Sequence, residues 1–249
     1  MATPDNSMAG KVCLVTGATA GIGRMTAQEI ARRGGAVVIV GRNEGRCAAT
    51  VQMIRKETSN KAVDFLIADM SSQAEIRRLA REFATRHDRL HVLVNNAGGL
   101  FSNYRKSIDG IELTFALNHL GYFLLTHLLL DLLKASAPAR IVNVASGAHF
   151  WVREFDFDSF VPEGRKRGVR AFRASRLGNW LCSVFAPWKH PGLWRYSQTK
   201  LANLLFTYEL ARRLEGTSVT ANALNPGLVA SNLMSGNGLF GWIMRRYAA

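Results

Sequence analysis

A tyrosine and a lysine four positions apart are the residues of this sequence whose types and spacing first suggest chemistry. Tyr196 and Lys200 open the run YSQTKLANLLFTYELARRL, in which apolar residues recur at intervals of three and four, a pattern typical of a helix. On a helix the two side chains lie one turn apart on the same face. A phenol titrates at about 10, so a nearby ammonium would favour its deprotonation near neutral pH. The spacing fits equally two polar side chains that merely share a helix.

The elements that must position this pair alternate between strands and helices. Strands that are apolar throughout indicate a parallel sheet covered on both faces, and right-handed crossovers then produce a doubly wound α/β sheet of the Rossmann type. We predict strands over residues 11–16, 36–41, 63–68, 91–96, 139–145 and 218–224, and helices over 22–33, 44–58, 73–87, 110–134 and from 196 onward. A length of 249 residues suits one domain over residues 1–249.

Glycine-rich or polar motifs follow four of the predicted strands. Ligands of a doubly wound sheet bind beyond the carboxyl ends of its strands, so these motifs should line one crevice. The motifs are Thr16–Gly23, Asn95–Gly98, Ser146 and Asn225–Gly227. In the first of them, glycines permit a tight turn, and the following helix offers its N-terminus to a pyrophosphate; a plain glycine turn is the alternative. The residues predicted to contact a dinucleotide there are Gly17, Thr19, Gly21, Ile22 and Gly23.

The end of the second strand bears on the choice between two dinucleotides. An NAD site usually places an acidic residue there, whereas this sequence has Arg42, whose guanidinium suits the 2′-phosphate of NADP. Glu44 is expected to begin the next helix, and a solvated loop charge is the alternative for Arg42. Asp69 and the adjoining Met70 follow the third strand, where Asp69 would either accept from the adenine amine or cap a helix. The turn after the fourth strand would admit the cofactor ribose or only stabilise the sheet, and its candidates are Asn95, Ala97 and Gly98.

Taken together and in order, these motifs resemble those of the short-chain dehydrogenase/reductase family. The motifs are T-G-x-x-x-G-x-G, N-N-A-G, an asparagine in the long helix, a serine after strand five, Y-x-x-x-K and a late P-G, spread over about residues 11–229 with one gap. The stretches DGIELTFALNHLGYFLLTHLLLDLL, ARIVNVASGAH and YSQTKLANLLFTYELARRL look similar to the retinol dehydrogenase-like branch. The resemblance implies hydride transfer between NADP(H), preferred over NAD(H), and a lipophilic carbonyl or alcohol.

The resemblance also implies roles for individual residues. Tyr196 would be the general acid–base, while Lys200 would hold the nicotinamide ribose and lower the phenol pKa. Ser146 would hydrogen-bond the substrate oxygen, and Asn118 would anchor a water that leads protons away. Without the resemblance, Ser146 reads as a strand-end cap and Asn118 as a polar residue on a helix face. The nicotinamide side would be met by Pro226, Gly227 and Val229, next to Asn225, where many relatives of this branch have histidine.

Two departures from the family pattern concern the substrate side. Fifty positions separate Ser146 from Tyr196, and the surplus forms an insertion at about residues 151–193 that is basic at first and apolar in NWLCSVFAPW. It would be a plain loop, a lid, an anion-binding arm or a peripheral membrane contact. Residues 228–249 are a shortened segment in which no last strand is evident. The alternative function is therefore a catalytically impaired NADP-binding or scaffold protein of the same fold.

Composition narrows the metals, partners and cellular compartment that we expect for this protein. Three cysteines are too few and too scattered for a disulfide framework or a zinc site, so we expect no metal and a cytoplasmic protein. The net charge of +14 would suit polyanions, but the basic residues are dispersed and no aromatic-interleaved motif accompanies them. We therefore expect no nucleic acid; an arginine-rich arm over residues 165–176 that binds anionic surfaces is the minor alternative. The long helix and the helix that contains Tyr196 each carry more apolar surface than one face of the sheet can cover. We therefore predict a homodimer or a homotetramer.

Overall fold

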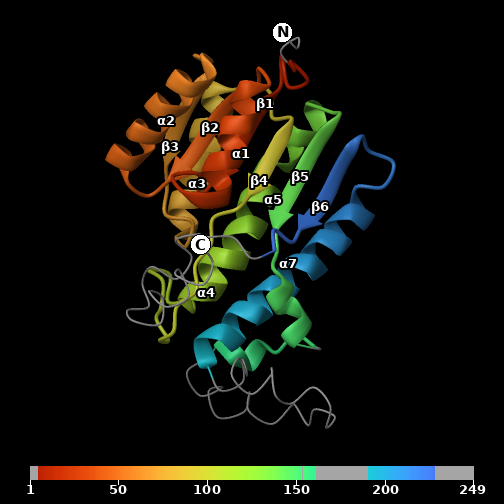
Figure 1. Cartoon of the computed structure of the whole chain (residues 1–249). Coiled ribbons are helices and arrows are strands. Elements are labelled where there is room, and N and C mark those ends of the chain that lie inside the picture. Colours follow the sequence, from red (N-terminus) through yellow and green to blue (C-terminus); the bar gives the residue numbers. More distant parts are fainter. Residues whose placement is uncertain (1–4, 153, 161–189, 228–249) are drawn as a thin grey trace.

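The central feature of the structure, a computed structural model, is a six-stranded parallel sheet with helices on both faces (Figure 1). The structure describes residues 5–152, 154–160 and 190–227. The strands are β1 Val12–Thr16, β2 Ala36–Gly41, β3 Val63–Ile67, β4 Val92–Asn95, β5 Ala139–Val144 and β6 Val219–Leu224. Their order is β3-β2-β1-β4-β5-β6, and every neighbouring pair is parallel. The predicted doubly wound sheet is confirmed, with its switch point between β1 and β4.

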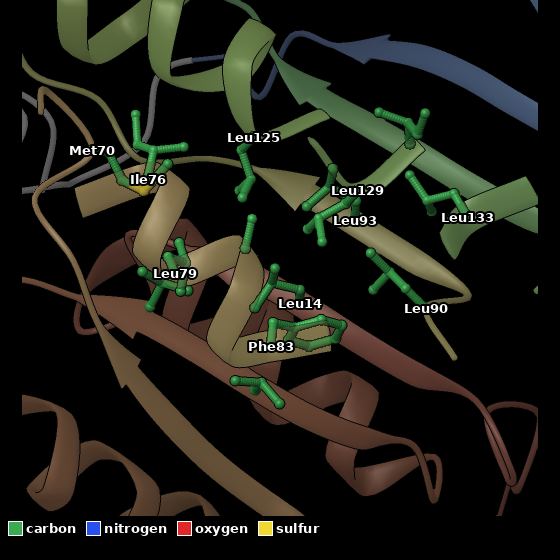
Figure 2. Packing of buried hydrophobic residues seen from close by; sticks show 14 of the residues in the cluster. Leu14, Met70, Ile76, Leu79, Phe83, Leu90, Leu93, Leu125, Leu129 and Leu133 are labelled. Carbon is green, nitrogen blue, oxygen red and sulfur yellow. The ribbon is translucent and has the colours of Figure 1, made fainter. Parts of the chain in front are cut away.

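Alternate residues of the strands point to opposite faces of the sheet and feed two separate cores. The principal helices are α1 Gly21–Arg32, α2 Glu44–Thr58, α3 Gln73–Arg86, α5 Gly121–Ala135 and α7 Pro191–Arg213. Val15 and Ile39 pack with α1 and α2 on one face, whereas Leu14 packs with α3 and α5 on the other. Figure 2 shows this second core, where Phe83 of α3 and Leu129 of α5 meet the sheet. Period-two alternation along fully apolar strands thus explains why both faces are covered.

The long helix begins later than its periodicity predicts and is not uniform. It consists of a first turn, α4 (Leu113–Phe115), a π-helical turn, η1 (Ala116–Leu120), and α5. Glu112 ends the preceding loop by accepting a hydrogen bond from the backbone N–H of Phe115 at 2.9 Å. Residues 110–112, predicted to be helical, therefore belong to the loop. Leu113–Ala135 is long and apolar enough to cross a membrane. Half of its most apolar stretch is buried inside the fold, as in a core helix.

Two short 3₁₀ turns lie at the start of the predicted insertion: η2 (Gly147–Trp151) leads into it, and η3 (Phe157–Phe160) lies within its first residues. After the gap at 161–189, α7 begins at Pro191, five residues before Tyr196. The basic and apolar parts of the insertion lie outside the described residues. So does the segment 228–249, whose sequence predicts no last strand. Within the described part of the chain, β3 and β6 are the two edge strands of the sheet.

Candidate active site

The loop after β1 leaves no room for side chains at two of its glycines. Gly17 has φ +66°, and a Cβ on it would lie 2.7 Å from the Cα of Ala97. A Cβ on Gly23 would lie 2.4 Å from Nδ2 of Asn96. That same Nδ2 donates to the carbonyl of Thr16 at 2.8 Å, which ties the loop after β4 to the loop after β1. The two loops predicted to share one crevice are therefore in direct contact.

The beginning of α1 is suited to a phosphate group. The helix starts at Gly21, which has φ +54°, and Ala20 precedes it without a capping side chain. Its first turn contains no acidic residue. The backbone N–H groups of this turn and the positive end of the helix dipole therefore point toward an anion. Thr19 packs against the end of β2, where a Cβ on Gly41 would lie 2.8 Å from Cγ2 of Thr19. The glycine cradle and the uncapped helix fit a bound dinucleotide.

The three candidates after β2 and β3 differ in their exposure and in their contacts. Arg42 is exposed directly after β2, and Asn43 rather than Arg42 caps α2 by accepting from the backbone N–H of Arg46 at 2.9 Å. Asp69 accepts from the hydroxyl of Ser71 at 2.7 Å. The helix-cap interpretation of Asp69 is wrong, because Ser72 caps α3. Met70, the neighbouring candidate, is buried.

Tyr196, the predicted general acid–base, lies close to Ser146 in the structure despite the long insertion between them in the sequence. The phenol is buried, and the Ser146 side chain is close enough to lower its pKa. Ser146 also accepts from the backbone N–H of Ala148 at 3.2 Å, so it caps η2 as well. Lys200 lies one turn along α7, with its Nζ 5.5 Å from the centre of the tyrosine ring and 2.7 Å from the carbonyl oxygen of Val144. The insertion has not separated the serine from the tyrosine.

Burial shifts the pKa values of Tyr196 and Lys200 in opposite directions. Burial raises the pKa of the Tyr196 phenol, and its hydrogen bond with Ser146 lowers that pKa in part. Burial lowers the pKa of the Lys200 ammonium to about 7. Desolvation therefore disfavours both charged forms singly, whereas a phenolate and an ammonium at this separation would stabilise each other.

Asn118 joins the loop after β4 to α7. Its Oδ1 accepts from the backbone N–H of Gly99 at 2.8 Å, and its Nδ2 donates to the carbonyl of Gly99 at 2.9 Å and to Thr199 at 3.2 Å. Its own carbonyl, in the π-helical turn, accepts from Nδ2 of Asn203 at 2.9 Å. Asn203 also pairs with the ring of His119 at 2.9 Å. The side chain of Asn118 is thus committed to protein partners, and its role toward a water stays a prediction.

The turn after β4 divides its candidates between the crevice and the interior. Ala97 adjoins Gly17 of the loop after β1, and Gly98 adjoins the π-helical turn, since a Cβ on Gly98 would lie 3.2 Å from Oδ1 of Asn118. The side chain of Asn95 instead points inward and donates to Asn143 of β5 at 2.8 Å and to Thr126 of α5 at 2.9 Å. Asn95 therefore fastens the sheet, which is the second of the two interpretations given for this turn.

The last motif reaches the same crevice from β6. Oδ1 of Asn225 accepts from the backbone N–H of Gly147 at 3.0 Å and from that of Gly227 at 3.2 Å. Asn225 thereby links the end of β6 to Gly147, the residue after Ser146. Pro226 is half-buried between them, and Gly227 has φ +72°. Val229 lies outside the described residues.

Sequence reasoning missed the residues that brace the site. Thr199 and Asn203 both bond to Asn118, and Thr207 continues the buried network by accepting from Nδ2 of Asn143 at 3.0 Å. Their spacing of four along α7 places Asn203 and Thr207 on one face of the helix. Polar residues recurring at helical intervals on an otherwise apolar helix were the available signal.

Comparison with known proteins identifies the family. The family model for short chain dehydrogenases matches residues 11–154, more than half of the chain. This protein belongs to the short-chain dehydrogenase family. Within that family it is retinol dehydrogenase-like, because proteins named retinol dehydrogenase match it at 40% to 43% identity over most of the chain.

The individual relatives define how far this likeness extends. Retinol dehydrogenase 12 of Mus musculus is 43% identical over 93% of this chain and 65% of its own length, and retinol dehydrogenase 13 of Homo sapiens is 41% identical over 93% and 63%. The chain thus spans less than two thirds of these two proteins. Among solved structures, the RhlG/NADP active-site complex of Pseudomonas aeruginosa has a TM-score of 0.69 at 26% identity, covering 99% of this chain and 90% of that one.

Proposed function

We propose that this protein is an NADP(H)-dependent oxidoreductase that transfers a hydride between nicotinamide and a lipophilic carbonyl or alcohol. The observation that carries the proposal is the buried Tyr196, which lies beside Ser146 and one helical turn from Lys200. A phenol in this setting can give a proton to, or take one from, a substrate oxygen held by the serine. The names of the retinol dehydrogenase relatives support the same reaction class.

The preference for NADP(H) rests on charge at the end of β2. Arg42 is exposed next to the glycine cradle, where a guanidinium can pair with a 2′-phosphate. The NADP complex of the RhlG relative supports this choice. Asp69 contributes no opposing contact to Arg42 within the described residues, since its carboxylate is bonded to Ser71.

The proton steps follow from the residues of the chain. NADPH, when bound, supplies the hydride for the substrate carbon. Ser146 donates a hydrogen bond to the carbonyl oxygen, and Tyr196 delivers the proton that converts this oxygen to a hydroxyl. The ammonium of Lys200, held at the carbonyl of Val144, stabilises the phenolate left behind. In the oxidative direction the same groups act in reverse.

The surroundings of the phenol favour a lipophilic substrate. Tyr196 packs with Leu100, Ala148 and Leu193 in a small apolar cluster. The η2 turn that starts beside Ser146 then presents Phe150, which is 78% exposed, to solvent. Apolar walls around a single polar centre orient a hydrophobic substrate by its oxygen.

The proposal is tested by cofactor binding followed by turnover. Purified protein is titrated with NADPH and, separately, with NADH while thermal stabilisation is followed, and aldehydes and ketones of increasing chain length are then screened. We expect tighter binding of NADPH and turnover that is lost in the Tyr196→Phe variant, with binding retained. Binding without turnover across the panel would instead establish the catalytically impaired NADP-binding protein.

We further propose that the protein forms a homo-oligomer through α5 and α7. Phe123 of α5 is 49% exposed, and its ring lies 5.4 Å from that of Phe206 of α7. Leu205 and Tyr208 of α7 are 50% and 71% exposed. Adjoining apolar side chains on two neighbouring helices are typical of a surface covered by a partner, here a second copy of this chain. Sedimentation velocity measures the oligomeric state directly.

A further inference from the structure

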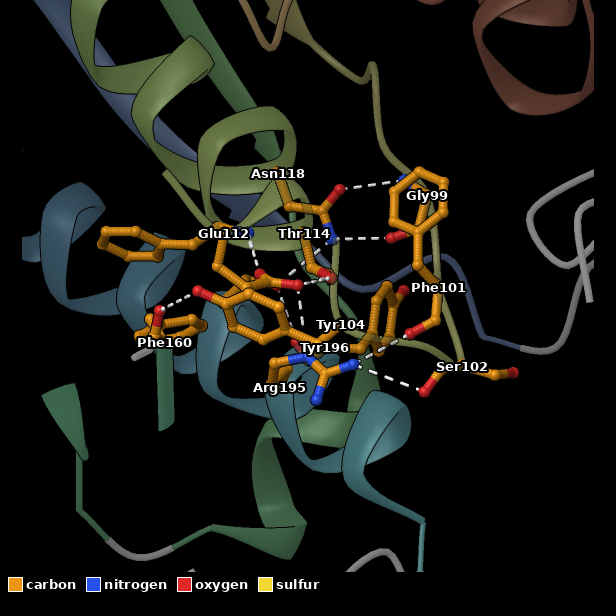
Figure 3. Close-up of polar contacts among 12 residues, drawn as sticks. Gly99, Phe101, Ser102, Tyr104, Glu112, Thr114, Asn118, Phe160, Arg195 and Tyr196 are labelled. Atoms are coloured by element: carbon orange, nitrogen blue, oxygen red, sulfur yellow. Dashed lines mark hydrogen bonds and ion pairs between the residues drawn. The ribbon is translucent and has the colours of Figure 1, made fainter. Parts of the chain in front are cut away.

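A buried ion pair lies immediately before the catalytic tyrosine. Nε of Arg195 lies 3.1 Å from Oε1 of Glu112, and the two side chains are 2% and 0% exposed. Glu112 belongs to the loop that precedes the long helix, and Arg195 belongs to the first turns of α7 (Figure 3). The pair therefore joins two segments that are 83 positions apart in the chain.

Each partner is embedded in further hydrogen bonds. Glu112 accepts from the hydroxyl of Thr114 and from the backbone N–H of Phe115, both at 2.9 Å. Burial raises the pKa of this carboxyl, and these donors together with Arg195 oppose that shift. Arg195 also donates to the carbonyls of Phe101 at 3.4 Å and Ser102 at 3.3 Å. The Arg195 guanidinium thus binds the loop at two separate points, at Glu112 and at the Phe101 and Ser102 carbonyls.

The same loop is tied to Asn118, another of the predicted site residues. Two residues before Phe101, Gly99 is bonded through both its N–H and its carbonyl to Asn118 (Figure 3). The start of α7 touches the loop a second time, because a Cβ on Gly192 would lie 2.4 Å from the carbonyl oxygen of Phe101. The position of Tyr196 relative to Gly99 and Asn118 therefore depends on how firmly the loop and α7 are joined.

We propose that Glu112 and Arg195 are positioning residues that set the place of Tyr196 in the active site. This inference rests on the proposed oxidoreductase function. Buried ion pairs contribute little net stability, because the cost of desolvation offsets much of the attraction. A buried ion pair differs from apolar packing in that its hydrogen bonds fix the geometry of both side chains. Here the fixed side chain is Arg195, the residue next to Tyr196. Displacement of a reacting group by about 1 Å can cost roughly a hundredfold in rate.

The test compares single and paired replacements in the full chain. Glu112→Gln removes the charge and keeps the shape, and the double variant Glu112→Leu/Arg195→Met replaces the pair by apolar side chains. The matched control is Glu209→Gln, which breaks an exposed pair with Arg212 on the same helix. For Glu112→Gln we expect a Tm lower by roughly 6–20 °C, a kcat lower by about 10- to 100-fold and a KM for NADPH within about threefold of wild type. The control should match wild type in all three.

The double variant separates positioning from simple stability. We expect it to recover most of the lost Tm while its kcat stays at least about tenfold below wild type, because the hydrogen bonds to the Phe101 and Ser102 carbonyls are absent. Recovery of kcat together with Tm would overturn the proposal, as would a wild-type kcat in Glu112→Gln. The double variant also decides the matter if the single variant does not fold.

A second readout does not depend on turnover. Hydrogen–deuterium exchange should accelerate at the backbone amides of residues 99–104 in Glu112→Gln and remain unchanged in Glu209→Gln. Unchanged exchange in the first variant would overturn the coupling between pair and loop. A wild-type protein without turnover on any substrate would refute the proposed function, whereas the exchange measurement would still judge the coupling by itself.

Discussion

Replacing Lys200 by methionine should stabilise the protein while abolishing its activity. Burial lowers the pKa of this lysine from 10.5 to about 7. At about 1.36 kcal/mol per pKa unit, that drop corresponds to roughly 5 kcal/mol of folding stability lost at neutral pH. Methionine has a similar shape and no charge to desolvate, but it leaves the carbonyl of Val144 without its 2.7 Å donor, at a cost of about 1–3 kcal/mol. The net gain should be about 2–4 kcal/mol.

The pH dependence of this gain is its signature. The pKa of Lys200 is lower in the folded than in the unfolded protein, so the unfolded chain binds more protons between pH 7 and 10.5. Wild-type stability should therefore rise with pH across this window, and the advantage of the Lys200→Met variant should shrink. Thermal unfolding from pH 7 to 9.5 should show a Tm of the variant at least about 4 °C above wild type at pH 7, with a difference that narrows as pH rises.

A matched control and a clear contrary result complete this experiment. Lys134→Met replaces an exposed lysine near the end of α5, and surface substitutions of this kind change stability by about 0.5 kcal/mol or less. A Tm of Lys200→Met several degrees below wild type at pH 7 would refute the reasoning. It would mean that the charged ammonium is stabilised by its neighbours more than burial penalises it.

Three further predictions concern the cradle, the cofactor and the oligomer. Gly17→Ala should destabilise the fold by about 1–3 kcal/mol in urea unfolding and weaken NADPH binding, because the residue has φ +66° and its Cβ would lie 2.7 Å from the Cα of Ala97; wild-type stability would contradict the predicted clash. Arg42→Asp should reduce the preference for NADPH over NADH at least about tenfold in binding titrations, through loss of a charge-assisted contact, and an unaltered ratio would remove Arg42 from the site. Phe123→Glu should shift the protein to monomers in sedimentation velocity without changing its Tm by more than a few degrees; an unchanged sedimentation coefficient would exclude this face as the interface.

Local patterns in the sequence were enough to predict the sheet, its neighbouring helices and most of the crevice. Fully apolar strands and helical periodicity are short-range properties, and ligand sites at the ends of parallel strands follow from topology alone. This is why Gly17 and Ser146 could be predicted to line one crevice before any contact was known, whereas Tyr196 was assigned to it by the resemblance to the short-chain dehydrogenase family. The start of the long helix was predicted too early, because Glu112 looks like any polar residue at a helix N-terminus until its buried partner is known.

Tertiary structure decided which polar residues face the crevice and which are fastened inside. Asn95 and Asn118 are the same residue type, yet the first bonds across the sheet to Asn143 and the second bonds to the loop at Gly99. The pairing of Glu112 with Arg195 likewise joins segments that no local pattern relates. Sequence periodicity determines the face on which a side chain lies, whereas its partner depends on packing between elements distant in the chain. The sequence by itself therefore determined the fold and predicted the chemical groups of the site, and only the folded structure showed which distant side chains pack and bond next to Tyr196.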